Sequence, residues 1–385
     1  MPGDVRRGEA AAADGWPPAY AGGDDDRRAL LVLASLRGID AGGLLALAAR
    51  EGSAAASLEA IRAGRAGSEA DQHHARLIDA DRVAARVADV GARFVPVGSP
   101  GYPSQLEHLR DPPAALFVRG RPLPGISSAV GVVGSRRCTD LGREIAREIG
   151  RGLAAAGVCV VSGAARGIDA ASHEGALAAA GHTVAVMACG IDEVYPPGSR
   201  SLVGRILQTG TVVTEYAPGV PAEAFRFPTR NRIVAALGRG VVVVEGAERS
   251  GTLSSARHAL DVGREVFAVP GSVTTATSYT PNALIRDGAT LIRGVDDLLA
   301  DLGLDGSGDD RTVPLDLTLA ERAAFDAVNG AVLPDRVASD VGVSVPEALG
   351  LLMRLEMRGL VRSAAGRFER RFRGAGRQPE ASPPM

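Results

Sequence analysis

A series of apolar, β-branched runs alternates with helical segments between residues 129 and 299, and this alternation constrains the fold more than any other feature of the chain. Near-continuous apolar strands separated by helices are typical of a parallel sheet that carries helices on both faces. We therefore predict an α/β protein with a mostly parallel sheet. The predicted strands are Val130–Val133, Val158–Val161, Thr183–Met187, Thr211–Thr214, Val241–Val244, Glu265–Val269 and Ala289–Ile292, and two shorter runs, Arg93–Val97 and Ala115–Val118, precede them.

Composition and periodicity divide the rest of the chain. The segment before the central domain is helical in pattern and predicts a small SAM-like or helix-hairpin-helix-like domain. The segment after it combines helical runs with a short basic ending, which is the pattern of a winged helix. Stretches rich in Ala, Gly, Pro and Asp predict tails and a linker. The predicted parts are a disordered tail at 1–25, the helical domain at 26–92, the central domain with its N-terminal connector at 93–300, a linker at 301–314, the winged-helix-like domain at 315–373 and a disordered tail at 374–385.

The turn Arg37–Gly42 in the helical domain allows two interpretations. Its backbone N–H groups could hold a phosphate, as in a helix-hairpin-helix, or the turn could simply join two helices of a small bundle. Because the turn lacks a Gly-x-Gly sequence, we favour the second interpretation.

The basic residues narrow the possible chemistry. All 43 of them are arginines, since the sequence contains no lysine. This excludes enzymes that need a Schiff-base lysine, a P-loop lysine or the strand lysine of a protein kinase. Any anion must be held by guanidinium groups, hydroxyls or backbone N–H groups. The net charge of −2 argues against coating nucleic acid by bulk charge, but a local basic groove remains possible.

The cysteines and the chain termini predict a soluble, cytoplasmic protein without a metal. Cys138, Cys159 and Cys189 lack metal-binding or redox-motif spacing, and no HExxH-type pattern is present. The N-terminus has no apolar signal segment, and no run of about eighteen apolar residues could span a membrane.

Gly, Ser, Thr and Arg follow the predicted strands of the central domain, notably at Gly134–Thr139, Ser162–Asp169 and Arg249–Thr252. Ligands bind beyond the carboxyl ends of parallel strands, and helix N-termini there favour anions. Several loops with this chemistry suit an extended chain of phosphates. Aromatic residues interleaved with arginines, as in Phe225–Arg232, suit single-stranded nucleic acid. The candidate stacking residues are Tyr195, Tyr216, Phe225, Phe227 and Tyr279.

Several of these residues have structural alternatives. Arg230 and Arg232 could pair with Glu215 or Glu245 instead of holding a ligand. Glu245 and Asp169 could be catalytic, but no nucleophile and base accompany them, so we expect them to orient arginines. His173 is expected to be a buried hydrogen-bonding residue. No catalytic residue is predicted.

The order and spacing of the motifs resemble the DNA-processing protein A (DprA/Smf) family, most strongly over residues 129–299. Ser199 and Thr280 depart from the family pattern, where Asn and Gly respectively are usual. The matching blocks are Val133–Arg136, Ser162–Asp169 with His173, Gly190–Asp192 with Tyr195-Pro196, Phe227-Pro228 with Arg230–Ile233, Glu245 with Arg249–Gly251, Gly263-Arg264 with Val269–Ser272, and Asn282, Leu284, Ile285 and Gly288-Ala289.

This resemblance implies an extended Rossmann-like central domain and a non-enzymatic function without a cofactor. Family members bind single-stranded DNA, form homodimers through that domain and load the RecA recombinase during natural transformation and homologous recombination. The expected partners are therefore single-stranded DNA, RecA and a second copy, with no membrane. The candidate nucleic-acid-binding residues are Gly134, Ser135, Arg136, Thr139, Ser162, Gly163, Arg166, Gly167, Phe227, Arg230, Asn231, Arg232, Arg249, Ser250, Gly251, Thr252 and Asn282.

Two other functions stay open. One is a Rossmann-like enzyme that hydrolyses nucleoside monophosphates. Such enzymes carry a PGGxGT loop, and the comparable Arg249–Thr252 lacks the double glycine. The other is a winged-helix regulator of duplex DNA, in which residues 311–385 would carry the binding.

Overall fold

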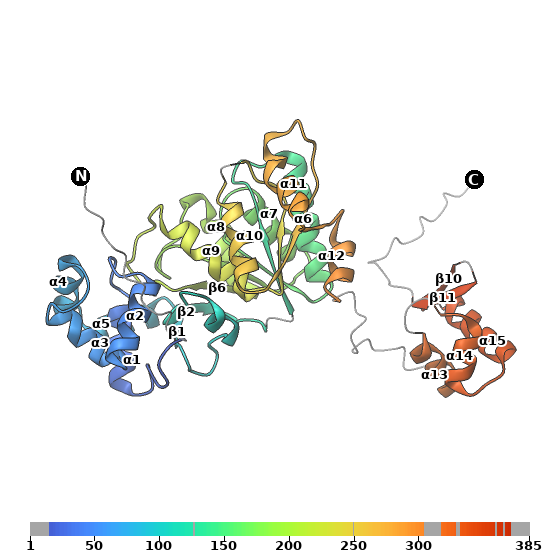
Figure 1. Cartoon of the computed structure of the whole chain (residues 1–385), viewed down its shortest axis with the longest axis horizontal. Helices are drawn as coiled ribbons and strands as arrows, with labels where there is room; N and C mark the ends of the chain where they lie inside the picture. Colours follow the sequence, from blue (N-terminus) through green and yellow to red (C-terminus); the bar gives the residue numbers. More distant parts are fainter. Residues whose placement is uncertain are drawn as a thin grey trace, which may run out of the picture. The chain divides into compact units, whose positions relative to one another are not determined.

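The computed structural model describes residues 15–125, 128–248, 250–303, 317–328, 332–358, 360–364 and 366–370. The chain divides into two compact units, Met1–Leu302 and Gly303–Met385. Figure 1 shows the elements of each unit. The predicted linker and C-terminal tail fall mostly or wholly outside the described residues.

A nine-stranded sheet forms the centre of the first unit, in the order β1-β2-β6-β5-β4-β3-β7-β8-β9. The pairs β1–β2 and β2–β6 are antiparallel and all the others are parallel. The prediction of an α/β fold with a mostly parallel sheet is therefore confirmed. The strands are β1 (Ala92–Pro96), β2 (Ala115–Gly120), β3 (Ala129–Val133), β4 (Cys159–Ser162), β5 (Thr183–Val186), β6 (Thr211–Thr214), β7 (Gly240–Val243), β8 (Glu265–Ala268) and β9 (Thr290–Leu291).

Helices cover both faces of the sheet. The strand β5 shows this, since Val184 and Val186 pack with the helix residue Ile233, whereas Ala185 on the opposite face packs with Ile206. Helices that pack on one another share a face, as α6 does with α7, α7 with α8, and α9 with α10. The helices of this region are α6 (Asp140–Ala155), α7 (Ile168–Ala178), α8 (Arg200–Thr209), α9 (Arg226–Leu237), α10 (Thr252–Asp261), α11 (Tyr279–Arg286) and α12 (Val295–Asp301).

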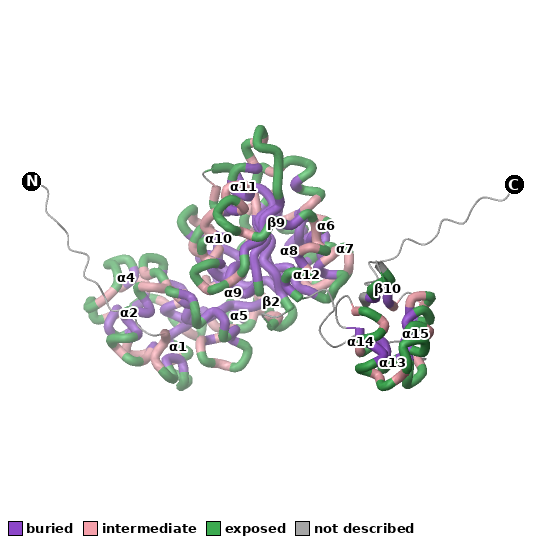
Figure 2. Tube along the Cα trace, turned by 45° about the vertical axis from the view of Figure 1, so that its right-hand side comes forward, coloured by how far each residue is buried: buried purple, intermediate pink, exposed green. Residues whose placement is uncertain are grey.

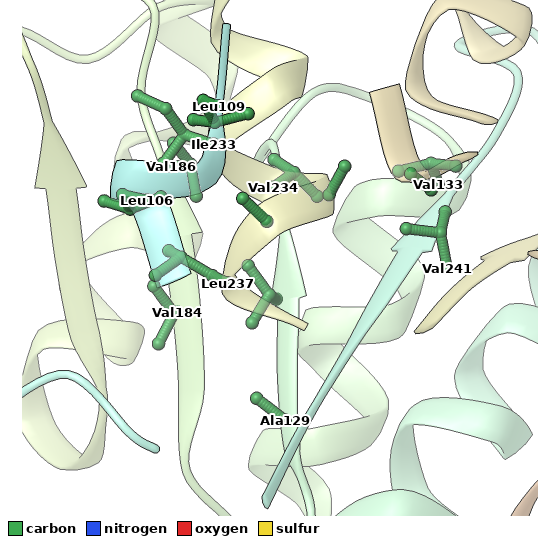
Figure 3. Close-up of a cluster of buried hydrophobic side chains, with 14 of the residues drawn as sticks. Leu106, Leu109, Ala129, Val133, Val184, Val186, Ile233, Val234, Leu237 and Val241 are labelled. Carbon is green, nitrogen blue, oxygen red and sulfur yellow. The ribbon is translucent and has the colours of Figure 1, made fainter. Parts of the chain in front are cut away.

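The largest apolar core lies between the sheet and α9 (Figure 3). Val184, Val186 and Val241 from the strands meet Ile233 and Leu237 of α9, and all five are fully buried. The short 3-10 helix η1 (Ser104–His108) adds a further layer over α9 through Leu106. Figure 2 shows the buried strands running through the middle of the unit. This packing fixes α9, whose first turns carry several of the predicted site residues.

The strand order reverses at β3. From β3 the chain builds outward through β4, β5 and β6 on one side, and through β7, β8 and β9 on the other. Such a switch point separates the loops at the carboxyl ends of two neighbouring strands, which leaves room for a ligand there. The loops after β3 and β7 flank this position.

Five helices precede the sheet, and they begin earlier than predicted. Tyr20 lies within the predicted tail at 1–25, yet it is only 1% exposed. Its ring packs 4.9 Å from that of Trp16, and its hydroxyl donates to Ser57 Oγ at 3.1 Å. Residues 15–25 therefore depart from the predicted tail, because one aromatic pair anchors this segment, which has no periodicity, while residues 1–14 of the predicted tail lie outside the described residues. The helices are α1 (Asp24–Leu33), α2 (Ala41–Glu51), α3 (Ala54–Arg62), α4 (Glu69–Leu77) and α5 (Ala80–Asp89).

The turn between α1 and α2 already has an anionic partner inside the unit. The backbone N–H groups of Arg37 and Gly38 donate to Asp71 Oδ1 at 3.2 and 2.8 Å. Two backbone N–H groups of this turn are thus occupied by a carboxylate of α4.

In its described residues, the second unit has three helices followed by an antiparallel hairpin. Two of the helices begin with capping boxes, at Thr318 with Glu321 and at Ser344 with Glu347. Its small core includes Val337, Leu352 and Leu355. The elements are α13 (Leu319–Ala327), α14 (Pro334–Val341), α15 (Val345–Met357), β10 (Val361–Ala364) and β11 (Arg367–Arg370). The winged-helix assignment stays a prediction. No helix in the described ranges has the length and apolarity that crossing a bilayer requires.

Candidate nucleic-acid interface

A pocket of about 650 Å³ lies at the switch point, where the loops after β3, β4 and β7 meet the start of α9. A larger cavity of about 780 Å³ lies beside residues 15–22. Its one arginine, Arg27, donates to Ala21 O, so the switch-point pocket is the better anion site. The predicted residues that the switch-point pocket brings together are Gly134, Ser135, Arg136, Gly163, Phe227, Arg230, Asn231, Ser250, Gly251 and Thr252.

Small residues allow these loops to approach one another. Gly167 has φ +85°, and a Cβ there would overlap the carbonyl oxygen of Ser135. The same carbonyl accepts the N–H of Ile168 at 3.3 Å, while Ser135 N donates to Glu245 O at 2.8 Å. The loops after β3, β4 and β7 are therefore joined through Ser135. A side chain at Gly134 would overlap Ile168, so the β3 loop also needs its glycine.

A cation and two aromatic rings stand together at the pocket. The Arg136 guanidinium carbon lies 4.7 Å from the centroid of the Phe227 ring. Tyr195 packs against the same ring at 5.5 Å between centroids, and it is 47% exposed. The exposed guanidinium can bind a phosphate while the rings offer surfaces for base stacking.

A second arginine of the pocket is buried. Arg230 is 3% exposed and donates to Val186 O, but its Nε has no hydrogen-bond partner. Burial lowers the pKa of Arg230 and raises that of the neighbouring Asp169 carboxyl above its usual range. Asp169 also lines the pocket and accepts the N–H of Ala165 at 3.3 Å. A buried pair of opposite charges therefore lies at this pocket.

Arg232 is placed differently from its neighbours. It is 1% exposed, and its two terminal nitrogens donate to the Glu215 carboxylate at 2.8 and 2.7 Å. Its Nε lies 3.1 Å from Asp111 Oδ2. Arg232 does not line the pocket, so of the two predicted interpretations its geometry matches the ion pair with Glu215.

Other predicted residues also lie outside the pocket lining. Ser162 is fully buried and donates to Val132 O at 2.6 Å. Asn282 bonds to both the N–H and the carbonyl of Gly271, at 3.1 and 3.0 Å. Arg166 is exposed, and its guanidinium lies beside Gly198 in the 3-10 helix η3 (Pro197–Ser199). The predicted residues outside the lining are Thr139, Ser162, Arg166, Gly167, Arg232 and Asn282, while Arg249 lies outside the described residues.

Glu245 was expected to orient an arginine; among the described residues its carboxylate binds Thr139. Its carboxylate accepts the N–H of Thr139 at 2.9 Å and the Thr139 hydroxyl. Thr139 in turn caps α6 by accepting the N–H of Gly142 at 2.9 Å. Thr139 stands directly before the helix, and a threonine in that position is the sequence signal for a helix cap.

The two residues that depart from the family pattern also hold loops. Ser199 donates to Ala164 O at 3.0 Å, which joins η3 to the β4 loop. Thr280 donates its hydroxyl to Ala247 O at 2.7 Å and its N–H to Gly246 O at 2.8 Å. Thr280 therefore supports the loop after β7. Sequence reasoning missed Arg137, an exposed residue of the pocket, although it follows Arg136 directly.

His173 lies fully buried on α7, as expected. Its Nδ1 lies 2.7 Å from Thr183 Oγ1, whose only hydrogen is donated to Val160 O. Nδ1 therefore carries the imidazole proton, and Nε2 has no partner. Burial lowers the pKa of His173 to about 3, so the ring is neutral at physiological pH.

This burial predicts acid sensitivity. Because the unfolded state binds a proton near pH 6.5 and the folded state does not, stability falls as pH drops below that value. We expect His173 to contribute a loss of roughly 2 kcal/mol between about pH 7 and about pH 5. Urea unfolding at both values, with His173→Asn as the comparison, measures it. An equal loss in both proteins would contradict the assignment.

Among the described residues, no group of three or more His, Cys, Asp or Glu side chains is arranged to hold a metal ion. All three cysteines are free, and Cys159 and Cys189 are buried.

Comparisons with known proteins place this geometry in context. Residues 93–303 match the family model described as DNA recombination-mediator protein A. The chain is 43% identical over 255 residues to the putative DNA processing protein DprA of Mycobacterium tuberculosis, covering 64% of this chain and 66% of that one. It is 35% identical over 243 residues to DNA processing protein DprA of Bacillus subtilis, covering 63% and 81%. Protein Smf of Escherichia coli is 38% identical over 287 residues, covering 72% and 77%.

Two solved structures resemble the fold. DNA processing protein A from Streptococcus pneumoniae superposes with a TM-score of 0.59 at 29% identity, covering 72% of this chain and 97% of that one. DNA processing protein A from Helicobacter pylori has a TM-score of 0.50 at 28% identity, covering 55% and 97%. The Helicobacter structure is described as giving insight into a single-stranded DNA binding mode.

Proposed function

The chain belongs to the DNA recombination-mediator protein A family, and from this premise we propose that it binds single-stranded DNA in the switch-point pocket. The observation that carries the proposal is the cluster of Arg136, Phe227 and Tyr195 at that pocket. Guanidinium groups hold phosphates bidentately, and exposed rings stack on any base. Binding is therefore expected to depend little on base sequence.

Backbone groups support the same function. The pocket includes Ser250, Gly251 and Thr252, where α10 begins, and no side chain caps that helix. The N–H of Leu253 donates to Ser250 O at 3.3 Å, and the helix N-terminus as a whole favours an anion, as at other phosphate-binding helices. Arg166 adds positive charge beside η3, at the edge of the sheet where the parallel strands have their carboxyl ends. We call this edge the rim.

The central test compares arginine variants. Arg136→Ala and Arg166→Glu are expected to weaken binding of an oligo-dT, with the salt dependence (log K against log[salt]) flattened by about 0.7 for each lost phosphate contact. Fluorescence anisotropy over a range of salt concentrations measures both quantities. Arg65→Glu is the matched control, since Arg65 is exposed on the N-terminal helical domain. If both variants keep the wild-type affinity and salt slope, Arg136 and Arg166 do not contact the bound strand.

The same premise leads to the wider role. We infer that the bound strand is delivered to the RecA recombinase, that two copies associate through the central domain, and that the protein acts in transformation or recombination in the cytoplasm without a catalytic step. Assembly of RecA on single strands covered by a single-strand-binding protein tests delivery. Sedimentation of the full chain tests association.

Two rival functions have distinct tests. Release of free base from nucleoside monophosphates would support a hydrolase. The Glu245 carboxylate is hydrogen-bonded to Thr139, the cap of α6, which leaves it poorly placed to act on a nucleotide. Loss of all DNA binding on deleting residues 311–385 would support a winged-helix regulator. Electrophoretic shifts with single and double strands separate the two DNA-binding functions.

A further inference from the structure

The loop between β5 and η3 carries Tyr195, and a carboxylate holds the middle of this loop. Asp192 Oδ1 accepts the N–H of Gly219 at 2.8 Å, and Asp192 Oδ2 accepts a hydrogen bond from a terminal nitrogen of Arg86 at 2.7 Å. Gly219 belongs to the loop after β6, and Arg86 belongs to α5. One carboxylate therefore joins three segments that lie far apart in the sequence.

The backbone at Gly219 permits the approach of Arg86. Gly219 has φ +84°, and a Cβ there would lie 2.6 Å from a terminal nitrogen of Arg86. A residue with a side chain would be strained in this conformation and would displace the guanidinium from Asp192. The carbonyl of Gly219 also accepts a hydrogen bond from Arg37 at 3.2 Å, which adds a second contact from the N-terminal helices.

Apolar side chains connect the same segments. Leu31 of α1 and Val83 and Val87 of α5 lie in one buried cluster with Ile191 of the β5 loop and Val220 of the β6 loop. Ile191 is 2% exposed. The N-terminal helices therefore pack against the base of the loop that follows β5, and the ion pair completes this contact on the outside.

Tyr195 follows Asp192 by three residues and reaches the switch-point pocket, where its ring packs 5.5 Å from that of Phe227. On the premise that single-stranded DNA binds at this pocket, we propose that Asp192 is a positioning residue for Tyr195. Arg86 holds the Asp192 carboxylate in turn. The N-terminal helices thus keep a stacking surface in place without contacting the strand themselves.

The exposure of the groups supports this role. Tyr195 is 47% exposed, so its ring has few protein contacts of its own, and a loop that must be ordered on binding costs affinity. Fixing the loop beforehand lowers that cost. The side chains of Arg86 and Asp192 are 54% and 18% exposed, and such a pair contributes little to overall stability. Its loss should therefore change binding while the fold is kept.

The direction of the effect separates positioning from charge. Removing a carboxylate near bound phosphates strengthens binding when repulsion is all that changes. For Asp192→Ala we expect the opposite, a loss of about three- to tenfold in affinity for oligo-dT, within the roughly fivefold to hundredfold that Tyr195→Ala should cost. Asp192→Asn and Arg86→Met both keep the hydrogen bond from Gly219, so each should lose only about two- to threefold.

An abasic strand identifies the step that is lost. Fluorescence anisotropy compares oligo-dT with a tetrahydrofuran strand of equal length, which has the same phosphates and no bases. We expect every variant to bind the abasic strand as the wild type does, with an unchanged salt slope on oligo-dT. In a Tyr195→Ala background, Asp192→Ala should have no further effect.

An ion pair within the N-terminal helices supplies the matched control. Arg28 pairs with Asp81 of α5 and is 51% exposed, close to the exposure of Arg86. Arg28→Met removes the same charge from the same helices, and it should leave the affinity for oligo-dT unchanged. Thermal unfolding establishes that each variant is folded.

Several results would overturn the inference. Wild-type or tighter binding of oligo-dT by Asp192→Ala would exclude the positioning role, and full affinity in Arg86→Met would exclude the part of the N-terminal helices. Equal losses on both strands, with a flattened salt slope in Arg86→Met, would make Arg86 a phosphate contact instead. Failure of the wild type to bind oligo-dT would overturn the proposed function, and the inference with it.

Discussion

Replacing Arg232 by methionine is expected to lower the free energy of unfolding by about 3–5 kcal/mol, because it leaves the Glu215 carboxylate buried without its partner. Both side chains are nearly inaccessible, at 1% and 9% exposure, and the two bonds between them are 2.8 and 2.7 Å long. Urea unfolding measures the loss. Glu215→Gln should destabilise in the same direction, and the double variant by less than the sum of the two.

A surface ion pair supplies the matched control. Arg143 and Asp140 lie 2.9 Å apart on α6 with side chains 47% and 99% exposed. Arg143→Met should therefore cost only about 0–1 kcal/mol. The expectation fails if Arg232→Met unfolds at the wild-type urea concentration while losing affinity for single-stranded DNA, since Arg232 would then be a ligand contact.

The contrast between Arg232 and Arg136 shows what the sequence alone could not decide. Both are arginines beside glycine- or aromatic-containing motifs, and both were predicted to contact nucleic acid. What separates them is Glu215, which follows β6 and meets Arg232 only because β6 and α9 lie close in the folded unit. The sequence offered this pairing as one of the interpretations of Arg232, but only the folded unit decides between them.

The sheet was predictable for the opposite reason. The strands β3 to β7 are buried on both faces, so runs such as Thr211–Thr214 and Val241–Val244 are continuous and β-branched. Every predicted run overlaps an observed strand. Ligand binding at strand ends follows from parallel topology, so the loops could be proposed before the structure. The departures arose where one side chain decides the outcome: Tyr20 anchors part of the predicted tail, and Thr139 binds Glu245 outside the pocket lining.

The positions of the pocket residues depend on contacts that no motif states. A Cβ at Gly163 would overlap the Arg230 guanidinium, and a Cβ at Gly134 would overlap the Ile168 side chain. These glycines suggested close approach to a phosphate. In the structure the close approach is to protein atoms, and it allows the buried Arg230 to reach the pocket.

Arg230 is expected to contribute more to DNA affinity than any exposed arginine of the rim. It lines the pocket, it is buried, and its Nε lacks a partner. A hydrogen bond to a charged group is worth about 1.5–3 kcal/mol, so Arg230→Met should weaken binding of an oligo-dT by roughly tenfold to a hundredfold. Circular dichroism and thermal unfolding establish that the variant is folded before anisotropy is compared.

A substitution of Asp169 tests the same pocket in the opposite direction, because it should strengthen the binding of single-stranded DNA. Burial raises the pKa of its carboxyl, and an ionised carboxylate there repels phosphate. As pH falls toward that raised pKa the carboxyl becomes neutral, so affinity for single-stranded DNA should rise. Asp169→Asn should bind several-fold more tightly than the wild type wherever the wild-type carboxyl is ionised, and its affinity should lose this pH dependence. His173 stays neutral throughout, since its pKa lies near 3, so it adds no charge to the profile. Identical pH profiles for wild type and Asp169→Asn would show that the charge pair does not face the bound strand.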